Sequence, residues 1–486
     1  MTALDDFKAI LAGAGVRDRV RKGLIGEDAL IEGPFGTRPL VYADYVASGR
    51  ALTQVEDFIR DKVLPYYANT HTQASFCGEY MTRLREAARF EIARLTGAGQ
   101  GMSVVFTGAG STAGLNRIVG LLDLAGLVRD GQRVVVLTGP YEHHSNILPW
   151  RETGAEVVEI AEAPEGGVDM DDLARALNAA QGAAQVVGTF SAASNVTGIL
   201  SDVDAVTRVL RAHGALAIWD YGCAGPYCAM DMKQGTDAQK DAIVFSAHKF
   251  PGGPGASGVA VIRDAIAGRA TPTLPGGGTV SFVSPWGHVY SDDLAAREEG
   301  GTPNVTGDIR AALAMLIKEA LGQDWLDARQ AELRARALKV WSRNDRIELL
   351  GKKGAPALPI FSFRVLDGRK DIVHHQFFTR LLSDLTGVQA RGGCACAGPY
   401  GHRLLGLGRA ESDATIAALR RGEETAKPGW IRLNFSALMT DEKADFIVDA
   451  VDNLARVAPD YAKYYHVDTN TARFHARSLP KGSLAS

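Results

Sequence analysis

The feature that most limits the possible folds is a long alternation of short apolar runs with helical patterns between Leu40 and Arg263. Helical patterns such as Leu115–Leu127, Met170–Ala180 and Asp202–His213 separate the runs. Such alternation predicts an α/β fold, with a mostly parallel seven-stranded sheet covered by helices on both faces. The runs expected to be strands are rich in Val, Ile or Phe: Ser103–Thr107, Arg133–Thr138, Ala155–Ile160, Gln185–Ser191, Ala215–Asp220, Ala242–Ser246 and Gly258–Ile262.

The second half of the chain has a different pattern, which predicts a smaller α+β domain. Glycine-rich loops at 276–278 and 300–303 follow the predicted sheet. We place a large domain at 40–305, and a small domain at 306–486 that also includes the N-terminal segment 1–39. That segment is expected to be a short helix, Leu4–Leu11, and then a glycine-rich loop; residues 408–428 look like a polar insertion. The elements expected after the helix-rich stretch Ile309–Asn344 are a strand Ile360–Val365, a helix Ile372–Leu385, a loop Arg391–Gly398, a strand Trp430–Phe435 and a helix Asp441–Val457.

Length, charge and cysteine content exclude several classes of protein. The 486 residues suit two domains. A net charge of -3 provides no strong positive field, so we expect no binding to nucleic acid. The N-terminus is acidic, and no apolar run approaches the length of a membrane span, so neither a signal peptide nor a membrane helix is expected. Five cysteines form no disulfide framework, which favours a reducing cytoplasm.

Lys249 lies where the sequence changes from a strand to a glycine-rich loop. It closely follows the predicted strand Ala242–Ser246 and precedes Phe250–Gly255, which contains three glycines. A lysine shielded from water favours its neutral amine, which can form a Schiff base with an aldehyde. Ser246 and His248 flank this lysine and can donate hydrogen bonds to a phosphate. By itself, such a lysine is more often a surface residue.

Two other segments suggest a ligand at the same edge of the predicted sheet. Asp220 closes a predicted strand, so its carboxylate would lie at the C-terminal edge, where open α/β sheets bind ligands. Phe106–Thr112 follows another strand, and its small residues would let a phosphate approach the N–H groups at a helix start. Each segment also has a simpler explanation, a capping aspartate and an ordinary strand–helix turn. The turn is neither a Walker loop nor a Gly-x-Gly-x-x-Gly motif.

Together the three features match the chemistry of pyridoxal 5′-phosphate (PLP). A lysine amine forms a Schiff base with the aldehyde of this cofactor, and a phosphate site anchors its other end. A carboxylate such as that of Asp220 keeps the pyridine nitrogen protonated, so that the ring can accept the electrons of a substrate carbanion.

Several segments resemble one family, the class V aminotransferases of PLP fold type I, and within it the cysteine desulfurase and selenocysteine lyase branch. Tyr141–Trp150 reads YEHHSNILPW and is similar to the branch's Glu-His-His-x-Asn-x-x-Pro-Trp motif, and Ser246–Lys249 is similar to its Ser-x-His-Lys motif. The other matching segments follow in order along the chain: Tyr42–Ser48, Gly110–Asn116, Ser194–Gly198, Glu299–Asn304 and Arg391–Ala397.

The resemblance implies which residues bind the cofactor. Lys249 would form the Schiff base, Asp220 would hold the pyridine nitrogen, and His143 would stack on the ring. Cys223 stands where the family usually has a glutamine that bonds the phenolic oxygen, and a thiol is a weaker donor. The residues implied for the phosphate are Ser111, Thr112, Ser246, His248 and, from the other subunit of a homodimer, Thr302.

The resemblance also implies a substrate site. Arg432 would clamp the carboxylate of an amino-acid substrate, and Asn195 would lie near that carboxylate or the O3′ atom of the cofactor. Arg391 precedes a loop similar to the one that holds the catalytic cysteine of the branch, and would order it. The thiolate of Cys396 would attack Sγ of a bound cysteine, leaving a persulfide and alanine. Cys394 is a rival for this role. No metal site is expected at the two cysteines, because no second Cys/His pair has suitable spacing.

Three functions remain open from the sequence. The first is a PLP-dependent cysteine desulfurase or selenocysteine lyase that uses Cys396, with a possible sulfur-acceptor protein. The second is a class V aminotransferase or C–S lyase in which Cys396 accepts no sulfur. The third is a binding protein without catalysis, which the presence of Lys249, Asp220 and Arg432 together disfavours.

Overall fold

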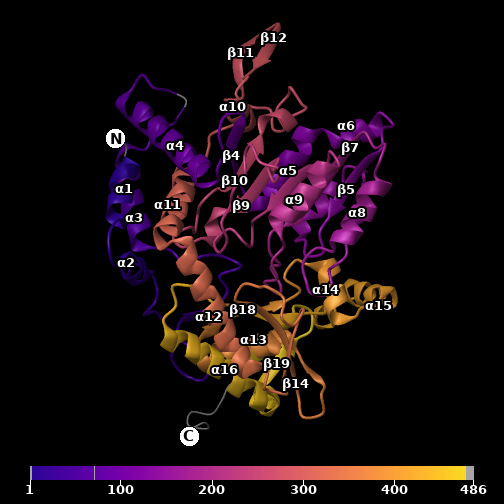
Figure 1. Ribbon diagram of the computed structural model, residues 1–486. Helices are drawn as coiled ribbons and strands as arrows, with labels where there is room; N and C mark the ends of the chain where they lie inside the picture. Colours follow the sequence, from indigo (N-terminus) through magenta and orange to yellow (C-terminus); the bar gives the residue numbers. More distant parts are fainter. Residues whose placement is uncertain (1–2, 71, 478–486) are drawn as a thin grey trace. The chain divides into compact units, whose positions relative to one another are not determined.

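The computed structural model describes residues 3–70 and 72–477 (Figure 1). They form two compact units. The large unit contains residues up to Ile25, Ser48–Ser194 and Leu200–Trp325, and the small unit contains Gly26–Ala47, Asn195–Ile199 and the chain from Leu326 onward. The domain limits proposed from the sequence, 40–305 and the remainder, stay a prediction.

A seven-stranded sheet forms the centre of the large unit, which confirms the predicted fold class. Its strand order is β4-β10-β9-β8-β7-β5-β6. Only β10 runs against its neighbours, so the other six strands point the same way. Each strand coincides with a predicted one to within a residue or two: β4 (Met102–Gly108), β5 (Val134–Thr138), β6 (Glu156–Glu159), β7 (Gln185–Ser191), β8 (Leu216–Asp220), β9 (Ala242–Ser246) and β10 (Gly258–Arg263).

Helices cover both faces of this sheet. Leu115 and Ile118 of α5 (Gly110–Leu122) share a buried apolar cluster with Val187 of β7. The next residue of β7, Gly188, points to the other face, where a Cβ atom would meet Leu210 of α9 (Val203–Ala212) at 2.5 Å. The remaining helices of the unit are α1 (Ala3–Leu11), α2 (Val16–Lys22), α3 (Thr53–Phe58), α4 (Phe76–Leu95), α6 (Leu124–Arg129), α7 (Leu148–Arg151), α8 (Met170–Ala179), α10 (Leu294–Glu298) and α11 (Val305–Leu321).

The small unit is built on an antiparallel sheet with the order β13-β14-β18-β17. Trp341 lies at the centre of its apolar core, fully buried against Phe361 and Phe435, and its Nε1 donates to the carbonyl of Val448 at 3.0 Å. The elements of this unit are the strands β13 (Ile347–Leu349), β14 (Ile360–Leu366), β15 (Ile372–Val373), β17 (Arg391–Gly393) and β18 (Trp430–Asn434), the pair β3 (Val41–Tyr42) and β16 (Val388–Gln389), the pair β1 (Leu30–Ile31) and β2 (Arg38–Pro39), and the helices α12 (Gln323–Trp341), α13 (His375–Thr386), α14 (Gly398–Leu405), α15 (Arg409–Arg420) and α16 (Asp441–Tyr461).

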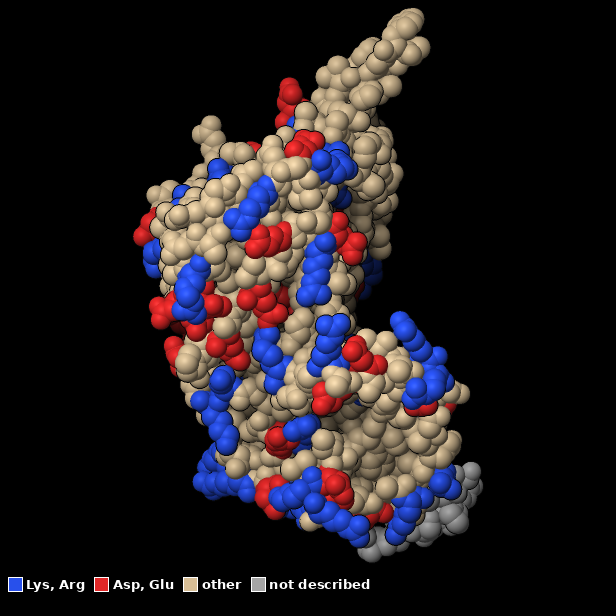
Figure 2. Space-filling model, turned by 90° about the vertical axis from the view of Figure 1, so that its right-hand side faces the viewer, with Lys and Arg blue, Asp and Glu red and all other residues tan. Residues whose placement is uncertain are grey.

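Some local structure differs from the prediction. The predicted helix Ile372–Leu385 is wrong at its start, because Ile372 and Val373 form β15, which pairs with the end of β14. The glycine-rich N-terminal loop contains α2, and the predicted polar insertion contains α15. Two hairpins were not predicted: β11 (Val280–Ser284) with β12 (Gly287–Tyr290), and β19 (Tyr465–Asp468) with β20 (Arg473–Ala476). The first hairpin carries no Lys, Arg, Asp or Glu, and Figure 2 shows it as an uncharged projection.

Within the described residues, no helix is long and apolar enough to cross a membrane.

Candidate active site

The C-terminal ends of the parallel strands of the large unit meet at one edge of the sheet, which is where ligands of such folds bind. Asp220 is the last residue of β8, and Ser246 is the last residue of β9. Lys249 follows β9 at the end of a short 3-10 turn, Ala247–Lys249. The structure therefore brings the lysine, the aspartate and the serine predicted from sequence to the same edge.

The start of α5 forms an anion-binding turn beside Ser246. The Oγ of Ser246 accepts a hydrogen bond from the backbone N–H of Ser111 at 2.9 Å, and the two hydroxyls are 3.1 Å apart. Gly110 has a φ of 62°, and a Cβ there would meet the Ser246 hydroxyl at 2.7 Å. The N-cap residue Ala109 makes no side-chain cap, so the other N–H groups of this helix start are placed to receive a phosphate, beside the hydroxyl of Thr112, which lies 2.7 Å from that of Ser145.

Asp220 is buried, with its Oδ1 accepting the N–H of Gly222 at 2.7 Å. Burial raises the pKa of Asp220, while the Gly222 hydrogen bond, the charge of Lys249 and the Ser111 hydroxyl act in the opposite direction. A cationic N–H donor beside this carboxylate would stabilise its charged form. The protonated pyridine nitrogen of PLP is such a donor, the amine of Lys249 can bond its aldehyde, and the α5 turn suits its phosphate. The residues at this edge therefore fit the cofactor.

His143 and Glu142 are held by a hydrogen-bond network that explains the spacing of their motif. The Nδ1 of His143 accepts the N–H of Ser145 at 3.1 Å, which orients the imidazole ring. Glu142 is buried and accepts hydrogen bonds from the Ser191 N–H at 2.7 Å, from the Ser191 hydroxyl at 2.8 Å and from the Asn146 amide. Asn146 in turn accepts from Trp150 at 2.9 Å. The network fixes the conformation of the turn that carries His143.

Three other predicted cofactor residues have definite surroundings. Burial lowers the pKa of His248 to about 4, so its imidazole is neutral near pH 7 and lies 3.5 Å from the Ser48 hydroxyl. Cys223 is buried, and its Sγ is 3.6 Å from the carbonyl oxygen of Ser194. Thr302 is exposed in the loop before α11. Their roles toward the cofactor stay a prediction.

In the small unit, Asp44 joins two of the predicted substrate residues. One carboxylate oxygen accepts from Arg432 Nη2 at 3.0 Å, and the other accepts from Arg391 Nε at 2.9 Å. Arg432 is buried, and its Nη1 also donates to the carbonyl of Asn195 at 3.0 Å. The carboxylate thus holds both guanidinium groups in place. The sequence interpretation gave Asp44 no role, although the residue lies in a segment that carries the family resemblance.

Two buried polar atoms of this cluster have no hydrogen-bond partner in the described part of the protein. They are Oδ1 of Asn195 and Nε of Arg432. Buried polar atoms are normally satisfied, so this acceptor and this donor are two groups that a polar ligand can satisfy. The α-carboxylate and α-amino groups of an amino acid have the matching acceptor and donor chemistry.

The loop after β17 holds Cys396 in an uncommon conformation. Ala395 and Cys396 have φ values of 53° and 54°, in the left-handed region that few non-glycine residues adopt. The side-chain amide of Asn195 donates to the carbonyl of Ala395 at 2.7 Å and so supports this conformation. Cys396 is exposed, whereas Cys394 is half-buried. Within the described residues, no three His, Cys, Asp or Glu side chains are grouped to hold a metal ion.

Comparison with known proteins identifies the family of this chain. Residues 41–445 match the model of the aminotransferase class-V family, and the chain belongs to that family. A probable cysteine desulfurase of Vibrio cholerae is 30% identical over 369 residues, which are 74% of this chain and 85% of the relative. A probable cysteine desulfurase of Halalkalibacterium halodurans is 27% identical over 365 residues, with the same two shares of 74% and 85%.

Solved structures share the fold. The apo structure of a cysteine desulfurase from Thermococcus onnurineus superposes with a TM-score of 0.72 at 23% identity, over 90% of this chain and 98% of that one. A cysteine desulfurase from Escherichia coli superposes with a TM-score of 0.68 at 21% identity, over 91% and 98%. The chain is a PLP-dependent enzyme of fold type I, as the sequence predicted.

Glu142 gives the large unit a stability that depends on pH. Burial raises the pKa of Glu142 to about 7 from an ordinary value of 4.5 in the unfolded chain. The folded protein therefore holds a proton that the unfolded chain releases, and this contribution to stability is full below pH 4.5 and is lost as pH rises through 7. Across this range the free energy of unfolding of the wild type should fall by roughly 2–3 kcal/mol. We expect this fall to be absent in Glu142→Gln.

Urea unfolding of the wild type and the variant, followed from about pH 5 to about pH 8, measures this difference. Glu165→Gln is the control, because Glu165 is exposed. An unchanged pH slope in Glu142→Gln would contradict the assignment.

Proposed function

We propose that the protein is a cysteine desulfurase that uses PLP bound to Lys249 and accepts sulfur on Cys396. The observation that carries the proposal is the conformation of the Cys396 loop. An exposed thiol is held in left-handed backbone geometry, and the residue that supports its loop, Asn195, also accepts from the carboxylate-binding Arg432. The relatives named cysteine desulfurase support the same activity.

The residues of the large unit would hold the cofactor and move a proton. When bound, PLP supplies a ring that accepts the electrons released at the Cα of an amino acid. Lys249 would bond the cofactor, and its amine, when free, would take the Cα proton of the substrate. Asp220 would accept the hydrogen bond of the pyridine N–H, and the Ser111 and Ser246 hydroxyls with the free α5 N–H groups would bind the phosphate. His143, oriented by Ser145, would cover the ring.

The residues of the small unit would bind the substrate and take its sulfur. Arg432 binds the α-carboxylate, and Asp44 keeps its guanidinium in position. The thiolate of Cys396 attacks Sγ of the substrate cysteine. An S–S bond forms, the Cβ–Sγ bond breaks, Cβ gains a proton and the proton taken from Cα is returned, so that alanine leaves and a persulfide remains on Cys396.

A second candidate is a class V aminotransferase or C–S lyase that does not use Cys396 as sulfur acceptor. The observation that favours it is Cys223, a buried thiol at the position where the family usually has a glutamine. Selenocysteine would be an alternative substrate of the first proposal, since selenium reacts at the same position.

The proposal extends to the setting of the enzyme. We place it in the cytoplasm as a homodimer in which Thr302 reaches the phosphate bound by the partner subunit. A sulfur-acceptor protein would then take the outer sulfur of the Cys396 persulfide. The exposure of both Thr302 and Cys396 supports these contacts.

Lys249→Ala should lose the visible absorbance of the bound cofactor after dialysis, because the covalent link to the protein is absent. Borohydride treatment of the wild type should fix the cofactor on Lys249, mapped by peptide mass spectrometry. Lys240→Ala is the control, since Lys240 is a buried lysine of the same unit that pairs with Asp204 at 3.0 Å. A borohydride adduct on any other lysine would refute the assignment.

Cys396→Ser should reduce alanine formation from cysteine by roughly 10³-fold or more, because removal of a nucleophile removes its step. Cys394→Ser is the matched control and should retain alanine formation and the protein persulfide. Loss of alanine in Cys394→Ser alone would move the role to that residue. If all three proteins transaminate another amino acid and none forms alanine from cysteine, the result favours the second candidate.

Thr302→Val should weaken PLP binding while the protein stays dimeric, because a hydroxyl that reaches across a dimer supplies a phosphate hydrogen bond. Equilibrium dialysis of PLP, with sedimentation to give the oligomeric state, measures both quantities. A wild-type monomer with full activity would rule out the shared site.

A further inference from the structure

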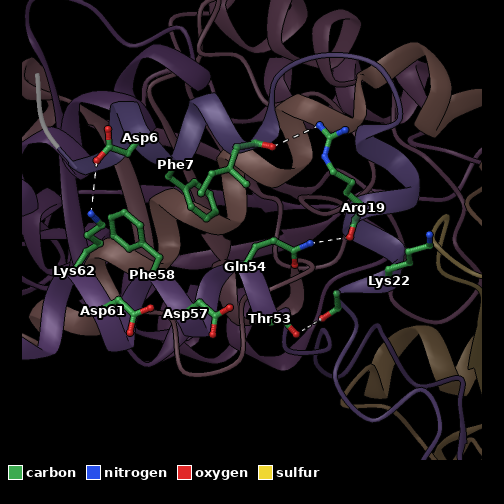
Figure 3. Close-up of a pocket in the computed structure, with 12 residues that line it drawn as sticks. Asp6, Phe7, Arg19, Lys22, Thr53, Gln54, Asp57, Phe58, Asp61 and Lys62 are labelled. Atoms are coloured by element: carbon green, nitrogen blue, oxygen red, sulfur yellow. Dashed lines mark hydrogen bonds and ion pairs between the residues drawn. The ribbon is translucent and has the colours of Figure 1, made fainter.

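Two hollows outside the candidate active site differ sharply in charge. The one in the large unit has a volume of about 420 Å³ and lies beside α1, α2 and α3 (Figure 3). Two of its three cations already have partners, since Arg19 donates to the carbonyls of Ala14 at 2.6 Å and Ala12 at 2.7 Å, and Lys62 lies 3.9 Å from Asp6. Three acids balance the three bases of its lining, so it has no excess charge for a ligand: Asp6, Asp57, Asp61, Arg19, Lys22 and Lys62.

The hollow in the small unit has an unbalanced charge. It has a volume of about 280 Å³ and is lined by the second half of α12 and the residue after it, the end of β13 with the loop that follows, the start of β14 and Thr197. All of its charged lining residues are cations, namely Arg334, Lys352 and Lys353, and no Asp or Glu lines it. An uncompensated group of three positive charges around one hollow favours an anion.

Arg334 differs from its neighbours on the same helix. Arg329 pairs with Asp441 at 2.7 Å, and Arg336 pairs with Asp445 at 2.8 Å. Arg334 has no carboxylate within 4.0 Å among the residues the structure describes. Its Nη1 donates to the carbonyl of Leu358 at 3.0 Å, its guanidinium lies 5.3 Å from the centre of the Phe361 ring, and burial lowers the pKa of Arg334. A half-buried cation without a counter-ion is costly, and a bound anion would offset that cost.

The loop that carries the two lysines is fixed against the floor of the hollow. Gly351 has a φ of 103°, and a Cβ there would meet Cγ2 of Thr197 at 2.7 Å. The close approach sets Lys352 and Lys353 at the rim, where both side chains are exposed. The remaining lining is largely apolar and includes Phe361. The ligand that fits therefore has a charged head and a short apolar body.

We propose that this hollow is a second binding site, for a small organic anion that carries a phosphate or carboxylate group. Arg334 would bind the anionic group as a fork, and the two lysines would add charge at the entrance. The hydroxyls of Ser342 and Thr197 lie in the same lining and can complete the hydrogen bonds.

The site is joined to the Cys396 loop by a short segment of the small unit. Arg334 holds the Leu358 carbonyl, and the Leu358 N–H donates to the carbonyl of Gly198 at 2.9 Å. From Gly198 the chain runs back through Thr197 to Asn195, whose amide holds the Ala395 carbonyl at 2.7 Å. An anion that draws Arg334 toward itself therefore acts on the segment that supports Cys396. We expect the bound anion to change the reactivity of this thiol.

The binding test uses the protein loaded with PLP, so that the cofactor's own phosphate site is filled. Phenyl phosphate, phenylpropionate and inorganic phosphate are titrated separately by calorimetry at low salt, and the visible absorbance must stay unchanged. The first two probes distinguish a phosphate from a carboxylate head, and inorganic phosphate tests the need for an apolar body. We expect one site per chain for one of the two organic probes.

The variants locate the site independently of enzymatic activity. Arg334→Gln and the double variant Lys352→Ser/Lys353→Ser should each weaken the binding by roughly tenfold or more. The double variant changes exposed residues only, so it folds even where Arg334→Gln does not. Arg336→Gln is the control and should leave the affinity within about twofold. The proposal would be overturned if no probe bound, or if Arg334→Gln and the double lysine variant both kept the binding. It would also be overturned if an acidic peptide bound and none of the small anions did.

The effect on Cys396 is measured by its rate of alkylation with iodoacetamide, followed by peptide mass spectrometry. The saturating organic probe should change this rate at least threefold in the wild type and leave it unchanged in Lys352→Ser/Lys353→Ser. Equal rates with and without the probe would refute the coupling. Because the measurement is alkylation of the thiol, a negative result here refutes the coupling and leaves the proposed desulfurase activity to its own test.

Discussion

The contact between the start of α5 and the end of β9 is the constraint on which the large unit's site depends. The Ser246 hydroxyl at the strand end accepts the N–H of Ser111 in the first turn of the helix, and only glycine at position 110 leaves room for it. Gly258 of β10 enforces the same closeness, because a Cβ there would meet the backbone of Gly110 at 2.4 Å. The helix N-terminus, with its unsatisfied donors, is thereby aimed at the edge where Asp220 and Lys249 lie.

A carboxylate between two guanidinium groups plays the equivalent part in the small unit. Asp44 fixes Arg391, at the start of the cysteine loop, and Arg432, on the central strand β18. The guanidinium group proposed to bind a substrate carboxylate and the start of the cysteine loop are therefore both held by one side chain. Buried charges of this kind are held by several partners at once, since each partner lost would leave a charge without compensation.

The sequence predicted the strands of the large unit and the position of Lys249 well, because fully buried parallel strands appear as unbroken apolar runs between turn residues. It predicted β15 wrongly, since two residues are too few for any period to be seen, and their pairing with β14 depends on a turn. It also gave no role to Asp44 or Glu142. Their partners lie far along the chain, 388 residues away for Arg432 and 49 for Ser191, and periodicity carries no information about such pairs.

Three charged groups of this protein lie where water cannot fully solvate them, and each is informative for the same reason. Burial raises the pKa values of Asp220 and Glu142 and lowers that of Arg334, so in each case the charged form is disfavoured by its surroundings. Glu142 recovers part of this cost from three donors within the fold. Asp220 accepts from the N–H of Gly222 and is also stabilised by the Ser111 hydroxyl and the charge of Lys249, while Arg334 donates to one carbonyl. Where the fold alone does not offset the free-energy cost of burying a charge, a ligand of opposite charge can offset it. The same physical cause therefore applies to the cofactor site and to the basic hollow.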